Sequence, residues 1–326
     1  MSKAIITGIG KYVPDNILSN KDLENMVDTS DEWIKQRTGI RERRIADEDT
    51  PTSELALKSA KEALEDANLS ADKLDLILVA TVTPDMLFPA TACLIQEELG
   101  ADNAAAFDLE AGCSGFVYGL SVADQFISSG TYENILIIGA ETLSKIVDWD
   151  DRSTCVLFGD GAGAAVLQPG SKGGILSTIL GSDGSGGNSL YMPGGGSLNP
   201  ATKESVSNKL HYIKMEGNQV FKFAVKKMGA ASLEVLEKAD FKPDDVDFFV
   251  PHQANTRIIS AAADRLNLNK ENVIVNLPYY GNTSSASVPI ALAEAVEENR
   301  INKGDLLVLV AFGAGLTWAA AAVKWQ

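Results

Sequence analysis

The sequence predicts an α/β protein built from layers of helices and sheets. Short apolar runs typical of buried strands alternate along the chain with longer stretches of helical apolar spacing. The two parts of the chain also repeat one another in the order of these signals. The alternation favours α/β layers over separate all-α and all-β parts, and the repeat indicates an internal duplication.

The expected elements follow in chain order. Strands are predicted at Ala4 to Ile9, Leu74 to Thr81, Ala104 to Leu109, Asn134 to Ala140, Gly163 to Leu167, Asp247 to Val250, Val273 to Asn276, Leu306 to Ala311 and Ala319 to Lys324. Helical spacing is found at Ser53 to Asp66, Phe116 to Ser128, Phe221 to Glu237, Thr256 to Leu266 and Ser285 to Glu298. The one glycine-dense loop, Gly181 to Gly196, lies near the middle of the chain, and we expect it to be the hinge between two halves.

In each half, a turn with a polar side chain comes directly before a long buried helix. The first turn carries Cys113, 22 positions before Ile135, and the second carries Asn282, 24 positions before Leu306. If the halves pack about a pseudo-twofold axis, these helix starts face each other at the centre of the molecule. His252 then arrives from a neighbouring strand end.

Composition limits the classes of function. The chain has 326 residues, of which 45% are hydrophobic, so it can bury a large core in one big domain or two. Its net charge of −16 argues against non-specific nucleic-acid binding, and an anionic ligand needs a local basic patch. Residues 1 to 10 lack the pattern of a signal peptide, and no uninterrupted apolar run approaches about 18 residues. We therefore expect a cytoplasmic protein without a membrane span.

The three cysteines do not predict a disulfide framework. Cys93, Cys113 and Cys155 are an odd number and lack C-x-x-C spacing, which also argues against a zinc site, and no metal is expected. Cys93 and Cys155 are interpreted as structural. Cys113 lies at a predicted helix start, where the positive end of the helix dipole and unpaired N–H groups favour a thiolate.

Cys113, His252 and Asn282 form the candidate catalytic set. Their contexts are EAGCSGF, VPHQAN and YGNTS, and each follows an apolar run that reads as a buried strand. Taken alone, each residue fits a structural role: a small buried hydrophobe, a core imidazole and a turn former. Together they supply a thiol nucleophile, an imidazole and an amide, which suits acyl transfer. The run Gly159 to Ala164 superficially fits a dinucleotide fingerprint, but it enters a β-like stretch, so we interpret it as a glycine turn.

A duplicated α/β chain with these motifs and a closing FGAGLTW resembles the thiolase superfamily. Within it, the sequence resembles the β-ketoacyl-acyl-carrier-protein synthase III family, which starts bacterial type II fatty acid synthesis, from about Ile5 to Lys324. Further matching strings are TSDEWIKQRTGIRERR, FGDGAGAAVL and KMEGNQVFKFAV. The resemblance implies a five-layer αβαβα architecture of duplicated thiolase-like halves, with the nucleophilic Cys in residues 1–172 and the His and Asn in residues 173–326.

Neighbouring subfamilies fit less well. Elongating condensing enzymes use two active-site histidines, whereas this chain has only His211, in a polar Lys-rich segment, and His252. Thiolases use a second, C-terminal cysteine, and no cysteine follows Cys155. Hydroxymethylglutaryl-CoA synthases pair Cys and His with a general-base Glu. Plant-polyketide-type enzymes share Cys, His and Asn but are typically longer chains.

The resemblance implies a decarboxylative Claisen condensation of an acyl-CoA primer with malonyl-ACP, without a metal or redox cofactor. Cys113 carries the acyl group, and His252 and Asn282 stabilise the enolate. The backbone N–H groups of Cys113 and Ala314 hold the tetrahedral oxyanion. By the same resemblance, Phe88 is expected to belong to the acyl pocket and the enzyme is expected to be a homodimer.

The resemblance also implies two recognition sets. CoA is bound by Thr29, Trp33, Arg37, Arg152, Gly217, Phe221 and Asn255. The acidic acyl carrier protein is bound by Lys222, Gln253, Ala254, Asn255, Thr256 and Arg257. A wider group of basic residues lies in the same two segments, at Lys209, Lys214, Lys226, Lys227 and Arg265.

Two alternatives stay open at this point. One is a starter or tailoring condensing enzyme of a polyketide-like or quinolone-like pathway with the same Cys-His-Asn chemistry. The other is a non-catalytic acyl-CoA-binding or ACP-binding protein on the same scaffold, against which the intact Cys, His and Asn argue. The sequence does not fix the primer, because acetyl, branched and longer acyl groups differ by only a few methylenes.

Overall fold

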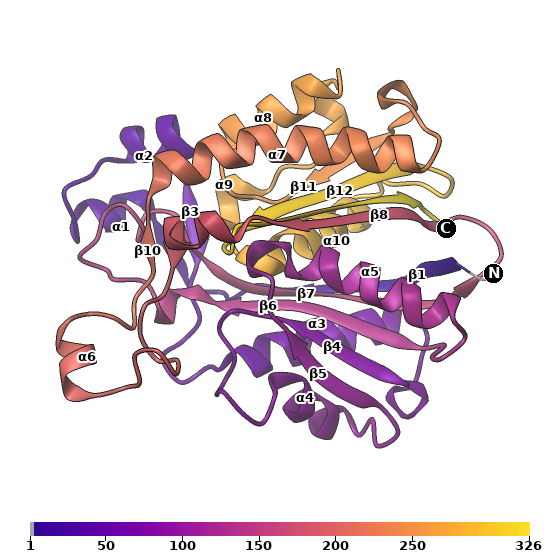
Figure 1. The fold of residues 1–326 in the computed structure, drawn as a ribbon, viewed down its shortest axis with the longest axis horizontal. Helices are drawn as coiled ribbons and strands as arrows, with labels where there is room; N and C mark the ends of the chain where they lie inside the picture. Colours follow the sequence, from indigo (N-terminus) through magenta and orange to yellow (C-terminus); the bar gives the residue numbers. More distant parts are fainter. Residues whose placement is uncertain (1–2) are drawn as a thin grey trace.

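The computed structural model describes residues 3–326, so residues 1 and 2 lie outside the described part of the chain. Its two main sheets lie face to face, with helices between them and on both outer faces (Figure 1). The main helices are α3 (Thr52–Asp66), α4 (Thr91–Leu99), α5 (Gly115–Ser128), α7 (Gly217–Lys238), α8 (Thr256–Arg265) and α10 (Ser287–Glu297). The layers run α3 and α4, first sheet, α5 and α10, second sheet, α7 and α8. This confirms the predicted five-layer fold.

The first sheet has the strand order β1-β7-β6-β4-β5. Strand β4 is parallel to β5 and β6, whereas β7 is antiparallel to both β6 and β1. The strands are β1 (Lys3–Tyr12), β4 (Leu76–Ala80), β5 (Ala105–Leu109), β6 (Ile135–Thr142) and β7 (Asp160–Gly170). Every predicted strand of the first half is therefore present, with small shifts at the ends.

The second sheet repeats this order with β11-β12-β13-β8. Strand β11 is parallel to β12, and β13 is antiparallel to both of its neighbours, as β7 is in the first sheet. The strands are β8 (Gly174–Ser182), β11 (Phe248–Pro251), β12 (Leu306–Gly313) and β13 (Thr317–Lys324). The shared order and directions support the expected duplication.

The predicted strand at residues 273–276, the counterpart of β5, is wrong. Only Val273 forms a bridge there, to Phe249 of β11. The Ile274 N–H still donates to Phe249 O, but the N–H groups of Asn276 and Leu277 donate to the side-chain oxygen of Gln253 and not to a neighbouring strand. A buried glutamine thus takes the place of a fifth strand at this edge.

The expected hinge at residues 181–196 is also wrong. Gly181 and Ser182 pair with β13, so this loop lies inside the second half, after its first strand. The chain instead passes between the sheets where β7 ends at Gly170 and β8 begins at Gly174. We infer that the halves 1–172 and 173–326 meet in this short turn.

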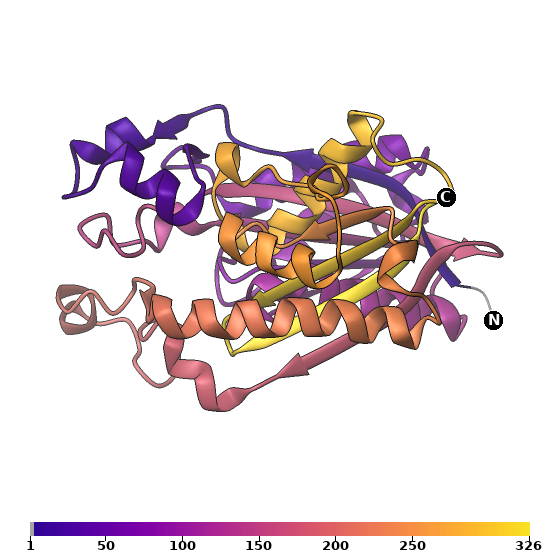
Figure 2. The ribbon, with the colours of Figure 1, turned by 90° about the horizontal axis from the view of Figure 1, so that it is seen from above.

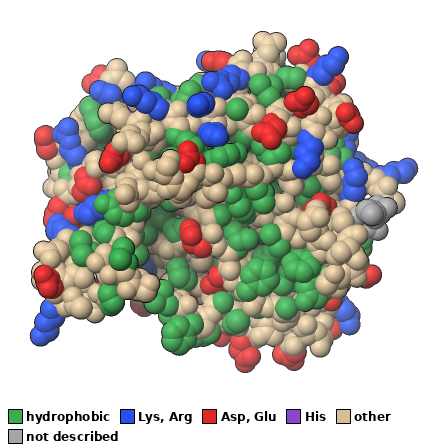
Figure 3. Space-filling view, viewed as in Figure 1, with side chains coloured by type: hydrophobic (Ala, Val, Ile, Leu, Met, Phe, Trp, Pro, Cys, Tyr) green, Lys and Arg blue, Asp and Glu red, His purple; other side chains and the backbone are tan. Residues whose placement is uncertain are grey.

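Shorter elements gather at one end of the molecule, away from both termini (Figures 1 and 2). They are β2 (Ile17–Ser19), α1 (Asn20–Glu24), α2 (Asp31–Thr38), β3 (Glu42–Arg44), β9 (Leu190–Tyr191), α6 (Lys203–Ser207), β10 (Lys214–Met215) and α9 (Leu277–Tyr280). Lys and Arg side chains lie along α7 and α8 on the face shown in Figure 3, and hydrophobic side chains gather over α5 and the β5 side of the first sheet. Among residues 3–326, no helix is long and apolar enough to cross a membrane.

Two short 3-10 turns meet at the centre between the sheets. They are η2 (Gly112–Ser114), which leads into α5, and η7 (Ser284–Ala286), which leads into α10. Gly139 of β6 makes this meeting possible, since a Cβ there would overlap the backbone carbonyl of Ser285. The two helix starts therefore face each other at the centre, as the duplication predicts.

We expect Gly139→Ala to lower the free energy of unfolding by about 1–3 kcal/mol, because the added methyl group pushes against backbone that cannot move aside cheaply. Urea unfolding followed by circular dichroism measures this change. Gly184→Ala is the matched control, since a Cβ there meets no atom within 4 Å. Equal stability of the two variants would contradict the tight packing at Gly139.

Candidate active site

Cys113 lies at the floor of a cavity of about 790 Å³. It follows β5, sits in η2 at the entry to α5, and is 8% exposed. The cavity wall is mostly apolar, with side chains that include Leu143, Ile146, Phe158, Leu190, Met192 and Ile213. A buried sulfur in an apolar chamber of this size has room for the chain of a thioester substrate.

Burial raises the pKa of the Cys113 thiol to about 12. The nearby carboxylates Glu141 and Glu110 raise it further, while the hydroxyl of Ser284 lowers it. The expectation that the helix start makes Cys113 a thiolate is therefore wrong for the resting protein. Desolvation outweighs the helix dipole, because the free energy lost when a thiolate leaves water is larger than the stabilisation from the partial charges at the helix start.

His252 follows β11 and is 1% exposed, and burial lowers its pKa to about 3, so the ring is neutral. Its Nδ1 lies 2.6 Å from Ser287 Oγ. The same Oγ accepts a hydrogen bond from the Gln253 backbone N–H at 3.2 Å. No other acceptor for the Ser287 proton is found among the described residues, so we assign this proton to Nδ1, which leaves the ring proton on Nε2 as a donor.

Asn282 is fixed through both its backbone and its side chain. Its N–H donates to Leu157 O at 2.9 Å, and its carbonyl accepts from Gly159 N at 3.0 Å. Its side-chain oxygen accepts the Ser284 N–H at 2.9 Å. Since the amide oxygen is occupied, the NH₂ group is the end of this side chain that remains to donate.

The end of β12 connects these groups. Phe312 packs edge-on against His252, with ring centroids 5.3 Å apart. The next two residues reach Cys113: a Cβ on Gly313 would overlap the Cys113 N, and a Cβ on Gly112 would lie 2.8 Å from Ala314 N. The end of β12 thus lies against the turn that carries Cys113, and Ala314 lines the same cavity as the sulfur. His252 and Asn282 lie behind this wall, outside the set of side chains that line the cavity.

Four of the expected CoA residues, Trp33, Arg37, Arg152 and Asn255, lie together near α2. The guanidinium carbons of Arg152 and Arg37 lie 5.5 Å and 6.0 Å from the centre of the Trp33 ring. The Asn255 side chain donates to Arg37 O at 2.9 Å, which ties α2 to the start of α8. Thr29 Oγ1 is buried without a hydrogen-bond partner among the described residues, and Gly217 begins α7.

The expected ACP residues divide into exposed and buried groups. Lys222 and Arg257 are exposed, and the Arg257 guanidinium lies 5.0 Å from the centre of the Phe221 ring. Ala254 and Thr256 are half-buried. Gln253 is 1% exposed, and its amide donates to Pro251 O and Ile274 O, so the assignment of Gln253 to the ACP surface is wrong.

Two other expected residues lie differently from their predicted places. Lys209 forms ion pairs with Asp148 and Asp150, at 2.9 Å and 2.7 Å, so its charge is already matched within the chain. Phe88 does not line the cavity of this chain, and its side chain is 83% exposed. Its neighbours Met86 and Leu87 do line the cavity, so the role of Phe88 stays a prediction.

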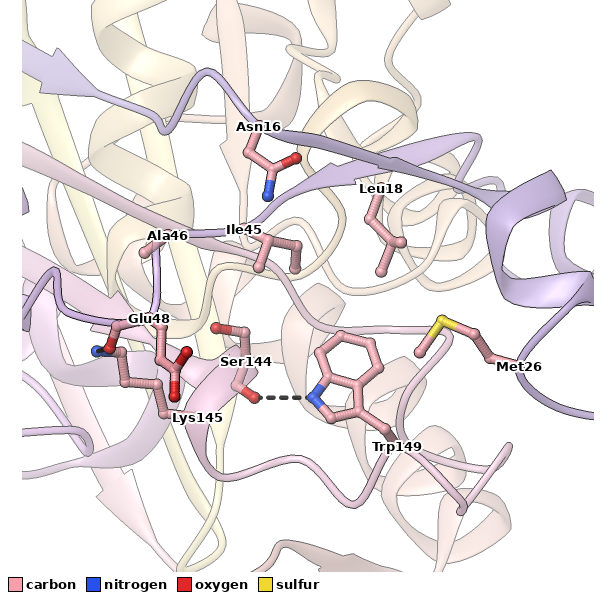
Figure 4. Close-up of a pocket in the computed structure, with 9 residues that line it drawn as sticks. All are labelled: Asn16, Leu18, Met26, Ile45, Ala46, Glu48, Ser144, Lys145 and Trp149. Atoms are coloured by element: carbon pink, nitrogen blue, oxygen red, sulfur yellow. Dashed lines mark hydrogen bonds between the residues drawn. The ribbon is translucent and has the colours of Figure 1, made fainter.

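Another pocket, of about 440 Å³, lies beside the loop after β6 (Figure 4). It is lined by Asn16, Leu18, Met26, Ile45, Ala46, Glu48, Ser144, Lys145 and Trp149. The Trp149 indole N–H donates to Ser144 O, and Lys145 Nζ donates to Glu48 O. This wall contains neither a nucleophilic Cys nor a His. Within residues 3–326, no three His, Cys, Asp or Glu side chains are placed to hold a metal ion.

Comparison with known proteins places this site in a class. Family models described as "3-Oxoacyl-[acyl-carrier-protein (ACP)] synthase III" and its C-terminal part match residues 107–184 and 236–325. A β-ketoacyl-[acyl-carrier-protein] synthase III of Caldanaerobacter subterraneus subsp. tengcongensis is 61% identical, with 98% of this chain and 97% of that protein covered. The fold and site define a thiolase-like condensing enzyme.

Solved structures agree with this class. The 3-oxoacyl-[acyl-carrier-protein] synthase III of Aquifex aeolicus is 51% identical, covers 99% of this chain and 100% of its own, and has a TM-score of 0.91. The priming β-ketosynthase of the R1128 polyketide pathway is 37% identical, covers 100% and 97%, and has a TM-score of 0.93. The chain belongs to the β-ketoacyl-acyl-carrier-protein synthase III family.

The lowered pKa of His252 predicts an acid-dependent loss of stability. The unfolded chain binds a proton at a pKa of 6.5 and the folded chain only at about 3, so this contribution is complete above 6.5 and is lost as pH falls toward 3. Between about pH 7 and about pH 5 it should lower the free energy of unfolding by about 2 kcal/mol. Urea unfolding of the wild type and of His252→Gln measures the difference. An identical pH slope in both would indicate a charged His252, as in a thiolate–imidazolium pair.

Proposed function

We propose that this chain catalyses the decarboxylative Claisen condensation of an acyl-CoA primer with malonyl-ACP. The products are 3-oxoacyl-ACP, CoA and CO2, and the reaction starts fatty acid synthesis. The observation that carries the proposal is that Cys113 lines a largely apolar cavity, with His252 and Asn282 buried behind its wall, in a chain 61% identical to a named synthase III. No cofactor is needed beyond the two thioester substrates.

In the first half-reaction, the Cys113 sulfur attacks the acyl carbonyl carbon, the bond from that carbon to the CoA sulfur breaks, and CoA leaves as a thiolate. The tetrahedral oxyanion lies between the backbone N–H groups of Cys113 and Ala314. The close approach of residues 112–114 to residues 312–314 supports this assignment. Main-chain donors held in place need no reorganisation as the charge develops.

In the second half-reaction, malonyl-ACP loses CO2, and the electron pair of the broken C–C bond becomes a thioester enolate. Nε2–H of His252 and the amide NH₂ of Asn282 donate to the enolate oxygen. The enolate carbon then attacks the acyl carbonyl on Cys113, and the Cys113 thiolate leaves. The Ser287 hydroxyl occupies Nδ1 of His252, and the Ser284 N–H occupies the side-chain oxygen of Asn282. Each side chain therefore keeps its donating end, Nε2–H or NH₂, free for the enolate oxygen, which supports these roles.

Both substrates carry anionic groups, and the chain offers separate basic surfaces to each. We place the CoA head at Trp33, between Arg37 and Arg152, where the distances suit cation–π contact. Exposed Lys222 and Arg257 face an acidic carrier protein beside it. The cysteines are all unpaired thiols, which fits the reducing cytoplasm.

We also propose a homodimer. Strand β5 has no neighbour on its outer edge, and its Phe107 is 39% exposed. Leu87 and Phe88, in the loop after β4, are 79% and 83% exposed. An unpaired edge beside exposed apolar side chains is the kind of surface that a second copy covers. In such a dimer, Phe88 has an apolar environment that one chain alone does not provide.

A polyketide-pathway starter synthase is the second candidate. The R1128 priming β-ketosynthase shares the fold at 37% identity, against 61% for the synthase III of Caldanaerobacter. This difference favours the role in fatty acid synthesis. A non-catalytic binding protein is disfavoured, because such a protein has no need of a buried thiol with oriented donors around it.

We expect Asn282→Ala to reduce decarboxylation of malonyl-ACP by about 10²–10³-fold, because one enolate donor is lost. Acylation of Cys113 by acyl-CoA should change far less, since Asn282 acts only on the enolate. Release of labelled CO2 and incorporation of a labelled acyl group measure the two half-reactions separately. Equal losses in both would contradict this division of labour.

We expect Lys222→Glu to raise the KM for malonyl-ACP severalfold at low salt and to leave acylation by acyl-CoA nearly intact. The reason is that the charge reversal faces only the carrier protein, and its effect should shrink as salt screens the exposed charges. Lys238→Glu is the matched control: it makes the same charge change on the same helix, about 24 Å away. Equal KM values for the two variants would remove Lys222 from the docking surface.

A further inference from the structure

Ser284 has an unusual combination of properties for a residue outside the expected catalytic set. It follows Asn282 by two positions, lines the cavity beside Cys113, and is 2% exposed. Its backbone lies in the left-handed region, with φ of 49°. Few residues other than glycine adopt this conformation, and strained positions of this kind cluster at functional sites.

The Ser284 hydroxyl is a buried donor without a hydrogen-bond partner among the described residues. It nevertheless lies close enough to Cys113 and Glu141 to lower the pKa of both. A buried hydroxyl that remains unpaired costs stability, so its retention at this place calls for a reason.

Glu141, one of the two groups that this hydroxyl influences, is already engaged by other donors. Its two carboxylate oxygens already accept hydrogen bonds from the hydroxyls of Thr81, Thr83 and Ser285 and from the Val82 N–H, at 2.7 to 3.2 Å. Three of these donors reach Oε2, and Oε1 receives the Ser285 hydroxyl and shares the Val82 N–H at 3.3 Å, so both oxygens are engaged. Among the described residues no side-chain hydroxyl other than that of Ser284 is placed to donate to the Cys113 sulfur.

The neighbouring contacts hold Ser284 in this position. Its own N–H is bound to the side-chain oxygen of Asn282 at 2.9 Å. The Oγ of the next residue, Ser285, lies 2.8 Å from both a Glu141 carboxylate oxygen and Ala80 O, and its single proton bonds to one of them at a time. The turn is therefore fastened on both sides of Ser284, while the hydroxyl between them stays free to rotate toward the sulfur.

We propose that Ser284 is a further catalytic residue, whose hydroxyl donates a hydrogen bond to the Cys113 sulfur when that sulfur is a thiolate. The inference rests on the proposed role of Cys113 as the nucleophile. The thiol proton leaves to solvent, and the hydrogen bond from Ser284 then stabilises the negative sulfur. The hydrogen bond from Ser284 lowers the pKa of Cys113, whereas the nearby Glu141 and Glu110 raise it. The neutral His252 provides no positive charge to stabilise the thiolate, so a hydroxyl donor is needed there.

The test is the rate at which iodoacetamide alkylates Cys113, followed by peptide mass spectrometry from neutral to alkaline pH. In this reaction the thiolate displaces iodide from the reagent. Ser284→Ala should slow alkylation at a fixed pH by roughly ten- to a hundredfold, the range for a hydrogen bond to a charged group. Its pH profile should shift to higher pH, which a purely structural role of Ser284 would not cause.

Ser284→Gly separates the hydroxyl from the backbone, because glycine adopts the same φ without strain. It should slow alkylation as much as Ser284→Ala does, and it also serves if the alanine variant fails to fold. Ser232→Ala removes an equally buried hydroxyl from α7 and should leave the rate unchanged. Wild-type rates in both Ser284 variants, or a loss in the alanine variant alone, would overturn the proposal. Failure of the wild-type Cys113 to accept an acyl group from acyl-CoA would instead overturn the proposed function.

Discussion

The close approach of the end of β12 to the start of α5 is the constraint on which the rest of the site depends. Side chains larger than hydrogen at Gly112 or Gly313 would collide with the backbone of the other segment. This contact sets the end of β12 against the turn that carries Cys113, and Phe312 at that end packs against His252. Since one segment comes from each half of the duplicated chain, the site exists only where the two halves pack together.

Burial determines the resting chemistry of the site. It raises the pKa of Cys113 to about 12 and lowers that of His252 to about 3, so both groups are neutral before substrate binds. A neutral imidazole with its proton on Nε2 is a donor for an enolate, and the Ser287 contact selects this form. In the proposed reaction, donors already in place around the sulfur and the enolate act strongly because their side chains are buried.

Much of this arrangement could be predicted from the sequence, because buried strands and helices have strong apolar patterns. Strand β8 was missed, since its Gly, Ser and Thr residues weaken that pattern, and the glycine loop next to it was therefore interpreted as the hinge. The predicted counterpart of β5 is not formed, because the side chain of Gln253 accepts the backbone N–H groups of Asn276 and Leu277. The thiolate prediction failed because a helix start is visible in sequence whereas desolvation depends on tertiary packing. Ser284 has no sequence signal beyond its position next to Asn282.

The central claim is that Cys113 alone carries the acyl group between the two half-reactions. Intact mass measurement after incubation with a panel of acyl-CoAs, with peptide mapping, tests it most directly. The account predicts one added acyl group, located on Cys113, absent from Cys113→Ala and discharged as 3-oxoacyl-ACP when malonyl-ACP is added. An acyl group on Cys93 or Cys155, or undiminished acylation of Cys113→Ala, would contradict it.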